Sequence, residues 1–519
     1  MPTSISLLLA LGLLLVGAAT GQNLSQEPSA PQAKAPEPMV RGATARPGRD
    51  QEFQTMADMA IAVPPEFGAD VLIRLAESTK APDRTTKIDL LRKAFYLAPA
   101  AEQPVKRGTL VFSPDTRAGF LALAFRMLNL DTLSLQSRVV GDMLHLDTVK
   151  ARAMLEEIKL PALSPVGCAE PLTYDVALFY RTVGQVAREG FAAKDKSEGR
   201  KIALLAPYVG SLQSHAQVRP AAQLLLSADL SPADLGQLAN MFAIALSHLR
   251  GDERSFASMN MDSDEYTAPG AIASLITALN AKRIPNVALI SALRQYLVSN
   301  FSGEVCGEAA NTPGSLPEVV KYFNREFQLA LQSAQIAPIT EEELRGVHVG
   351  EKLTDVSFWQ SPEAKKILHD EQRLKFGGGE TQLTIQERTT PAWSSQLTDF
   401  LAELAAWKSD RESVADFFDE KSSAYPNLIN LVPNGAERSR AIDAFVEFLE
   451  QNSAQAESRI EWMVMADHVL SGARAADDRQ EVILAFVNSR DSTLSLYGRL
   501  ERWQPRDASP PSKPSTGNN

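Results

Sequence analysis

The chain has 519 residues, of which 52 are Lys or Arg and 63 are Asp or Glu, so its formal net charge is −11. Hydrophobic residues make up 44% and charged residues 22% of the sequence, which is ordinary for a soluble globular protein and excludes a wholly disordered chain. The acidic balance argues against a general nucleic-acid binder, which would carry a basic patch. The length is enough for about two to four domains or one long repeat array.

Residues 1–21 have the pattern of a signal peptide. Residues 5–19 form an almost unbroken apolar run with a Leu-rich centre, and small residues follow it. Cleavage after Ala19 or after Gly21 fits the small-residue rule. One departure from the usual signal-peptide pattern is that no Lys or Arg precedes the run. The alternative is an uncleaved membrane anchor, although the run is shorter than the roughly 20 apolar residues of a span. We expect a protein exported to the periplasm or the extracellular space, with no transmembrane span after signal cleavage.

Two terminal segments have a composition that is typical of disorder. Pro, Ala, Gln and Ser dominate residues 22–52, and residues 504–519 are similar. Such segments bury too little apolar surface to offset the entropy of ordering them. The sequence therefore predicts a disordered Pro/Ala-rich linker at 22–52 and a disordered tail at 504–519.

Between residues 53 and 503 apolar residues recur with the period of an α-helix. Besides shorter patterns near residues 71–76 and 88–98, the pattern predicts helices over 114–128, 132–158, 173–189, 199–228, 232–250, 269–283, 286–300, 316–335, 361–373, 392–407, 411–424, 435–451, 456–471, 477–488 and 492–503. Start signals at Ser231 and Ser361, and capping-box patterns at 315–318 and 340–343, support these boundaries. Alternating residues make 381–388 the one strand candidate. The prediction is an all-α fold of helix pairs, either an α-solenoid or a helical bundle.

Two short segments resemble tetratricopeptide-type repeats. Residues 93–99, KAFYLAP, are similar to the end of the second helix of such a repeat, and residues 146–152, LDTVKAR, resemble a junction between repeats. The resemblance implies stacked helix pairs of that kind. It covers only these stretches, because the constant spacing of about 34 residues and the full repeat signature are not found.

Residues 346–390 interrupt the helical pattern. Gly346, Gly350 and the run at 377–379 surround only one convincing short helix. A long stretch with little regular structure is unusual inside a compact domain. We interpret it as an irregular junction between an N-terminal helical domain at 53–345 and a C-terminal helical domain at 391–503, and such junctions often hold a cleft.

Cys168 and Cys306 are the only cysteines. In an exported protein an even count favours a structural disulfide, here closing a loop of about 140 residues for roughly 5 kcal/mol of loop-closure entropy. A zinc site is disfavoured because the two residues lack ligand spacing, and a nucleophilic cysteine is the remaining alternative. A disulfide would place the loops before the predicted helices 173–189 and 316–335 side by side.

Several potential acid, base or metal-binding side chains fall in the irregular junction. The candidates for catalysis are His348, Glu351, His369 and Asp370, and Asp355 and Glu371 lie close to them in the sequence. Loops carry functional residues disproportionately, but solvated loops are also expected to be polar, and that is the competing interpretation. No histidine has a recognised metal spacing and no cofactor motif is present, so no metal and no cofactor are expected.

Three functions remain open, and the least specific of them is a structural envelope component that associates with itself. The first hypothesis is an exported helical interaction or scaffold protein with a protein partner in the envelope or the extracellular space and no nucleic-acid partner, which is an inference from fold class. The alternative is an exported all-α hydrolase or lyase with a cleft at the 346–390 junction. The enzyme hypothesis requires the four candidate residues to converge within hydrogen-bonding reach.

Overall fold

The computed structural model describes residues 49–102, 106–108, 116–160, 162–191, 199–260, 267–307, 316–344, 348–350, 357–408, 414–454, 459–473 and 476–503. The predicted signal peptide at 1–21, nearly all of the predicted linker at 22–52 and the predicted tail at 504–519 lie outside these residues. So do Glu351 and Asp355.

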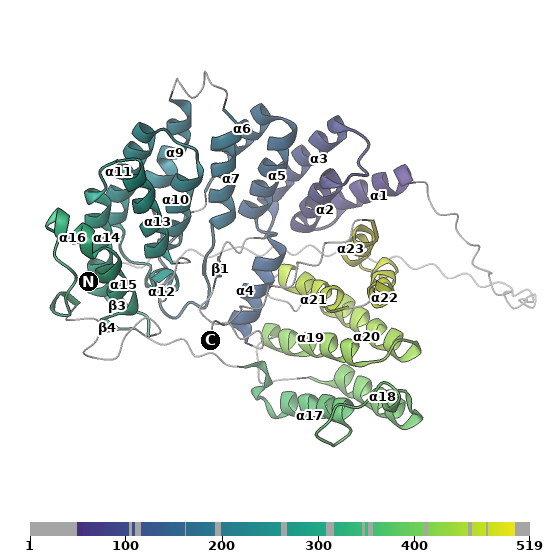
Figure 1. Cartoon of the computed structure of the whole chain (residues 1–519). Coiled ribbons are helices and arrows are strands. Elements are labelled where there is room, and N and C mark those ends of the chain that lie inside the picture. The colour runs from purple at the N-terminus through teal and green to yellow at the C-terminus, as the bar shows by residue number, and fades with distance from the viewer. Residues whose placement is uncertain are drawn as a thin grey trace, which may run out of the picture. The chain divides into compact units, whose positions relative to one another are not determined.

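The described residues are predominantly helical, which confirms the all-α prediction (Figure 1). The first series of helices comprises α1 (Arg49–Ala62), α2 (Pro65–Glu77), α3 (Arg84–Leu97), η1 (Ala98–Ala100), α4 (Arg117–Leu128), α5 (Thr132–Leu146), α6 (Thr148–Glu157), α7 (Ala177–Glu189), α9 (Arg200–Gly210), η2 (His215–Gln217), α10 (Val218–Ser227), α11 (Pro232–His248), α12 (Glu253–Asn260), α13 (Ala268–Ala281), α14 (Val287–Phe301), α15 (Glu318–Glu326) and α16 (Gln328–Ala334).

The second series follows the region of the predicted junction. It comprises η3 (Glu342–Leu344), η4 (Phe358–Gln360), α17 (Pro362–Phe376), η5 (Glu387–Thr389), α18 (Pro391–Ala406), α19 (Val414–Leu431), α20 (Ala436–Asn452), α21 (Arg459–Gly472), α22 (Ala476–Val487) and α23 (Ser492–Trp503). Short strands form two small ladders. β1 (Lys106–Gly108) is antiparallel to β2 (Thr173–Tyr174), and β3 (Glu304–Val305) is parallel to β4 (His348–Val349).

The helices between α5 and α16 pack in two rows. In one row α5 contacts α7, α7 contacts α10 and α10 contacts α13, and Figure 1 shows these helices side by side. In the other row α9 contacts α11 and α11 contacts α14, while α10 with α11 and α13 with α14 join the rows. This order is that of stacked helix pairs. The two segments that resemble tetratricopeptide repeats lie at the end of α3 and across the turn between α5 and α6.

Polar caps explain why several helices begin where the sequence predicts. The Ser231 hydroxyl accepts a hydrogen bond from the Asp234 amide at 3.2 Å, and Ser361 does the same for Ala364 at 3.0 Å. Each cap satisfies one of the amide groups that the first turn of a helix leaves unpaired. The predicted starts of α11 and α17 are therefore confirmed.

Some predicted elements are wrong. The predicted helix 132–158 is two helices, because Asp147 leaves the helical conformation and its carboxylate caps α6 through the Lys150 amide at 3.0 Å. The predicted helix 199–228 is also divided, because α9 ends at Gly210 and a short non-helical stretch precedes η2 and α10. The strand predicted at 381–388 is irregular and ends in η5, where Glu387 accepts two hydrogen bonds from Thr384. Ser315, the serine of the box predicted at 315–318, lies outside the described residues, and α15 begins at Glu318 after Pro317.

Helices from the two predicted domains contact one another. Helices α1 and α2 contact α23, and α4 contacts α21. A buried ion pair joins Arg74 of α2 to Glu501 of α23, with 2.6 Å between nitrogen and oxygen. Helices of the predicted N-terminal and C-terminal domains are therefore in direct contact among the described residues. Helix α1 begins at Arg49, so the helical body starts before the predicted linker end at residue 52.

Residues 118–146 are long and apolar enough by composition to cross a membrane. In the structure this stretch is not one helix. Asn129 ends α4 in a left-handed conformation with a φ of 52°. About three quarters of the most apolar window (75%) is buried inside the protein, as is usual for core helices.

Gly68 marks the tightest contact between α1 and α2. A β-carbon at this position would lie 2.0 Å from the carbonyl oxygen of Ala60, and backbone cannot move aside as a flexible side chain can. We expect Gly68→Ala to lower the free energy of unfolding by about 1–3 kcal/mol in urea denaturation, despite the better helix propensity of alanine. Gly167→Ala is the matched control, because no atom lies within 4 Å of its added β-carbon. Equal stability of the two variants would contradict this account of the packing.

Candidate functional site

The four residues selected from the sequence do not form a described cluster. The backbone of His348 pairs with Glu304 in the β3–β4 ladder, and Glu351 lies outside the described residues. His369 and Asp370 lie next to each other on α17. Among the described residues no interaction joins any two of the four candidates.

Asp370 and His369 have the surroundings of a solvated helix face. The Asp370 carboxylate makes ion pairs with Lys366 at 3.4 Å and with Arg373 at 3.5 Å, both within one turn of α17. The His369 side chain is exposed. Exposed pairs of this kind contribute little to stability or chemistry. This geometry favours the competing interpretation for these two residues.

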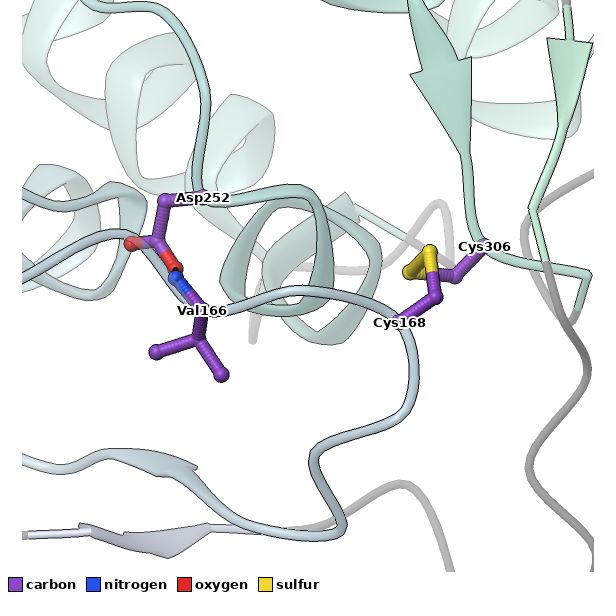
Figure 2. Close-up of a disulfide and its surroundings, with 4 residues drawn as sticks. All are labelled: Val166, Cys168, Asp252 and Cys306. Carbon is purple, nitrogen blue, oxygen red and sulfur yellow. Dashed lines mark hydrogen bonds between the residues drawn. A yellow bond between two sulfur atoms is a disulfide. The ribbon is translucent and has the colours of Figure 1, made fainter. Parts of the chain in front are cut away.

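The two cysteines form a disulfide, with an Sγ–Sγ distance of 2.16 Å and 5.1 Å between the α-carbons (Figure 2). Cys306 follows β3, and Cys168 lies in the loop that precedes β2. Close to Cys168, the amide of Val166 donates a hydrogen bond to the Asp252 carboxylate at 2.9 Å. The bond therefore joins the 168 loop to the β3–β4 ladder, as the sequence predicts.

A polar pocket lies among the C-terminal helices. Its volume is about 520 Å³. The residues that line it come from α17 and the loop after it, and from α19, α20, α21 and α22: Glu371, Lys375, Gln382, Asn427, Asn430, Leu431, Arg438, Ser471, Gly472 and Asp478. Leu431 is the only large apolar residue among them. Glu371, Lys375 and Gln382 belong to the 346–390 segment, so this segment forms one wall of the pocket.

The glycine run after α17 shapes that wall. Gly377 ends the helix in a left-handed conformation with a φ of 60°, which glycine adopts without strain. The chain then folds back, and the Leu383 amide donates to the Lys375 carbonyl at 2.9 Å. The glycine run therefore forms a helix C-cap, and the returning chain brings Gln382 near Lys375.

Asn427 and Asn430 form the opposite wall. They are three residues apart on α19, so they share one face of that helix. Gly472 at the end of α21 makes room for them, because a β-carbon there would lie 2.9 Å from the Asn430 amide nitrogen. Both asparagine side chains are exposed at the rim, where their carboxamides are available as donors and acceptors.

Glu371 is a buried acid at this pocket, with 7% of its surface exposed. Burial raises the pKa of its carboxyl to about 7, and the nearby Lys375 ammonium opposes that shift. Its Oε2 atom has no hydrogen-bond partner among the described residues. At neutral pH the group is therefore poised between its protonated and ionised forms.

Arg438 is a buried cation on α20, with 4% of its surface exposed. Its guanidinium lies 3.8 Å from the Asp478 carboxylate and 3.7 Å from that of Glu481, which is ion-pair range but longer than a hydrogen bond. Within the described part of the chain, its Nε and Nη2 atoms and Asp478 Oδ1 have no hydrogen-bond partner. Leaving such atoms unpaired costs about 1–3 kcal/mol each, so the pocket has unused binding capacity.

Glu371→Gln is expected to change the pH dependence of stability. The raised pKa means that the folded state binds the proton more tightly than the unfolded state, whose pKa is about 4.5. The stability that protonation contributes is complete below the unfolded value and is lost as the pH rises through about 7. Glu371→Gln has no carboxyl group to titrate at this position, so the variant does not lose this stability as the pH rises.

Urea denaturation of both proteins between pH 4.5 and 8 tests this expectation. The variant should gain stability relative to the wild type as the pH rises through this window. Parallel stability curves would show that Glu371 titrates normally in the folded protein.

Glu371 is recognisable in the sequence as one of the polar residues of the junction, whereas no sequence pattern points to Arg438 or Asp478. Both lie in the first turns of helices. Charged residues are common there, so neither position indicates a site from the sequence. Their proximity depends on the contact between α20 and α22, which no local pattern reveals. Within the described ranges, no group of three or more His, Cys, Asp or Glu residues could hold a metal ion.

Comparison with known proteins provides no precedent for this pocket. No protein-family model matches the chain, and no curated protein or solved structure is significantly similar to it. The resemblance of two short segments to tetratricopeptide repeats is therefore not extended to the whole chain. Any functional assignment rests on the residues of the chain itself.

Proposed function

We propose that the protein is an exported interaction protein that binds its partner at the polar pocket. The observation that carries this proposal is the concentration of unused hydrogen-bonding capacity in one place. Glu371, Arg438 and Asp478 all line the pocket, and each has a buried polar atom without a hydrogen-bond partner among the described residues. These atoms are covered in the free protein, and a partner that draws the three side chains toward it would satisfy them.

The form of the pocket supports a binding role. Its volume of about 520 Å³ lies within the range of roughly 300–1,000 Å³ that ligand pockets occupy. Carboxamides from Asn427, Asn430 and Gln382 surround the charged groups. Amides of this kind orient a ligand through paired donors and acceptors without reacting with it.

The cysteine pair supports export. Disulfides persist in oxidising compartments and are rare where thiols are kept reduced. The bond between Cys168 and Cys306 is compatible with a protein that leaves the cytoplasm. Together with the apolar run at 5–19, it supports a location in the periplasm or outside the cell, where the partner would be found.

Affinity capture from the envelope and secreted fractions of the native host tests the proposal. The wild-type protein is compared with Asn427→Ala/Asn430→Ala, which removes two exposed carboxamides at the pocket. The matched control is Ser395→Ala/Gln396→Ala, which removes two exposed polar groups from α18. We expect a partner that is retained by the wild type and the control, is lost with the pocket variant, and binds saturably when purified. Retention by all three proteins would place the contact elsewhere and contradict the proposal.

One observation favours a second candidate, an exported hydrolase or lyase that uses the same pocket. A carboxyl group with a pKa of about 7 has the proton affinity of a general acid or base at neutral pH. A screen of the wild type and Glu371→Gln against ester, peptide and glycoside substrates distinguishes the two functions. Turnover that the variant loses would replace the binding proposal with the enzymatic one.

A further inference from the structure

We propose that the pocket recognises a carboxylate attached to a peptide, with Arg438 as the anchor and Asn427 and Asn430 as partners for the adjoining amide groups. This inference rests on the proposed function, since it names the chemistry of the partner at the same pocket. The carboxylate comes either from a chain terminus or from an acidic side chain. Both sources present a planar anion next to a peptide group.

The geometry of the Arg438 guanidinium favours a carboxylate as the bound anion. Nε and Nη2, the two guanidinium nitrogens without a hydrogen bond among the described residues, lie on the same edge of the group. Two parallel N–H donors on one edge match the two oxygens of a carboxylate, which binds arginine in this bidentate way. Glu481 lies near this edge at 3.7 Å, but its other oxygen already accepts a hydrogen bond from Ser439.

The charge of the lining favours a singly charged ligand. Lys375 and Arg438 are cations, and Asp478 in the lining and Glu481 beside Arg438 are anions that offset them. Because Glu371 has a pKa of about 7, near neutral pH it adds at most a fraction of a negative charge. With Glu481 included, the charges around Arg438 nearly cancel, and such a site accepts a carboxylate with one charge more readily than a phosphate with nearly two.

The beginning of α20 adds to the attraction for an anion. Arg438 lies in the first turn of this helix of 17 residues, and Gly435 before it provides no side-chain cap. The amide groups of the first turn carry a partial positive charge that a side chain does not satisfy. The anchor thus combines a buried guanidinium with an uncapped helix N-terminus.

The remaining groups match a peptide rather than a sugar or an aromatic ring. Asn427 and Asn430 each offer one acceptor and two N–H donors, and Asp478 Oδ1 is an acceptor without a partner among the described residues. A peptide group presents one donor and one acceptor and pairs with both kinds. No Trp, Tyr or Phe is among the described residues that line the pocket, so a sugar ring would find no aromatic surface.

Three tetrapeptide probes test the inference on the purified protein. They are acetyl-tetraalanine with a free carboxylate, the same peptide as its amide, and an amidated peptide with one aspartate, each titrated at millimolar concentration by saturation-transfer NMR. We expect the amide without aspartate to bind about tenfold or more weakly than the better of the two carboxylate peptides. If the free terminus binds best, the source is a chain end; if the aspartate peptide does, the source is a side chain. Equal binding of all three peptides would overturn the inference.

Two variants locate the binding. Arg438→Gln removes the anchor and is expected to abolish the difference between carboxylate and amide peptides. Because Arg438 is buried and this change can disturb folding, Asn430→Asp provides a second test: it places a negative charge at the exposed rim and should weaken binding of the carboxylate peptides by about tenfold. Ser395→Asp, the same charge change on the exposed face of α18, should leave binding unchanged. Equal binding by Asn430→Asp and the control would contradict the proposed location.

Failure of the inference can be distinguished from failure of the proposed function. If no probe binds, but capture of the native partner still requires Asn427 and Asn430, the ligand class is wrong and the interaction role stands. If no probe binds and the capture does not depend on these asparagines, both proposals are wrong.

Discussion

Replacing Cys168 and Cys306 with serine is expected to lower the free energy of unfolding by about 2–5 kcal/mol. The disulfide joins residues that are 138 positions apart in the sequence, so it restricts the unfolded chain over a long loop. Loop-closure entropy for this length amounts to about 5 kcal/mol at 25 °C, which is the upper end of the expectation. The loop contains α7 and α9 to α14, which form most of the two rows of stacked helices.

Urea denaturation with and without a reducing agent measures this effect. Reduction should destabilise the wild type and leave Cys168→Ser/Cys306→Ser unchanged, because only the wild type has a bond to break. Nearly equal stability of the oxidised wild type and the double variant would show that the cross-link does not stabilise the stacked helices.

The buried His215 is expected to make the protein sensitive to mild acid. The imidazole is fully buried beside Phe256 and Tyr296. Its Nε2 atom is 2.5 Å from the Gly251 carbonyl oxygen, to which only an N–H can donate, and its Nδ1 atom is 3.1 Å from the Tyr296 hydroxyl. The neutral tautomer with the proton on Nε2 satisfies both partners. Burial lowers the pKa of His215 to about 4.

The direction of the effect follows from this shift. In the unfolded chain histidine has a pKa near 6.5, so at a pH between 6.5 and 4 the unfolded state binds a proton that the folded state does not. The stability due to neutral His215 is therefore complete above about pH 6.5 and is lost as the pH falls through about 4. A difference of about 2.5 pKa units corresponds to roughly 3 kcal/mol.

The stability of the wild type and His215→Gln, measured between pH 7 and pH 4, tests this account. The advantage of the wild type should shrink by about 3 kcal/mol over this range. His468, whose pKa burial also lowers, is present in both proteins, so its contribution cancels in the comparison. A constant difference between the two proteins would contradict the assignment of the acid sensitivity to His215.

The sequence predicts much of the helical framework because local chemistry determines it. Serine caps such as Ser231 and Ser361 act within one turn, so the sequence reveals them directly. The breaks between consecutive helices are harder to predict from the sequence. Asp147 ends one helix and caps the next, and the apolar period continues across it, so periodicity alone merges the two helices. The alternation at 381–388 predicts a strand, but no neighbouring strand is available there to pair with it among the described residues.

The candidate site was less predictable than the fold. The histidines His348 and His369 were selected for their residue type, and no described contact brings them together. The residues of the pocket meet through packing instead: Arg438 and Asp478 are far apart in the sequence and approach each other because α20 contacts α22. Glu371 belongs to the 346–390 segment that the sequence singles out, but its raised pKa depends on burial that only the folded chain provides.

The central claim is that the partner contacts the pocket around Glu371 and Arg438, and site-specific photo-cross-linking tests it most directly. A photoreactive residue replaces Gln382, an exposed residue that lines the pocket, or Gln386, an exposed residue of the same loop that does not. Each protein is irradiated in the native envelope and secreted fractions. We predict a cross-linked partner from position 382 that is absent at position 386 and is lost when Asn427→Ala/Asn430→Ala is added. Equal cross-linking from both positions, or none from position 382, would contradict a partner site at this pocket.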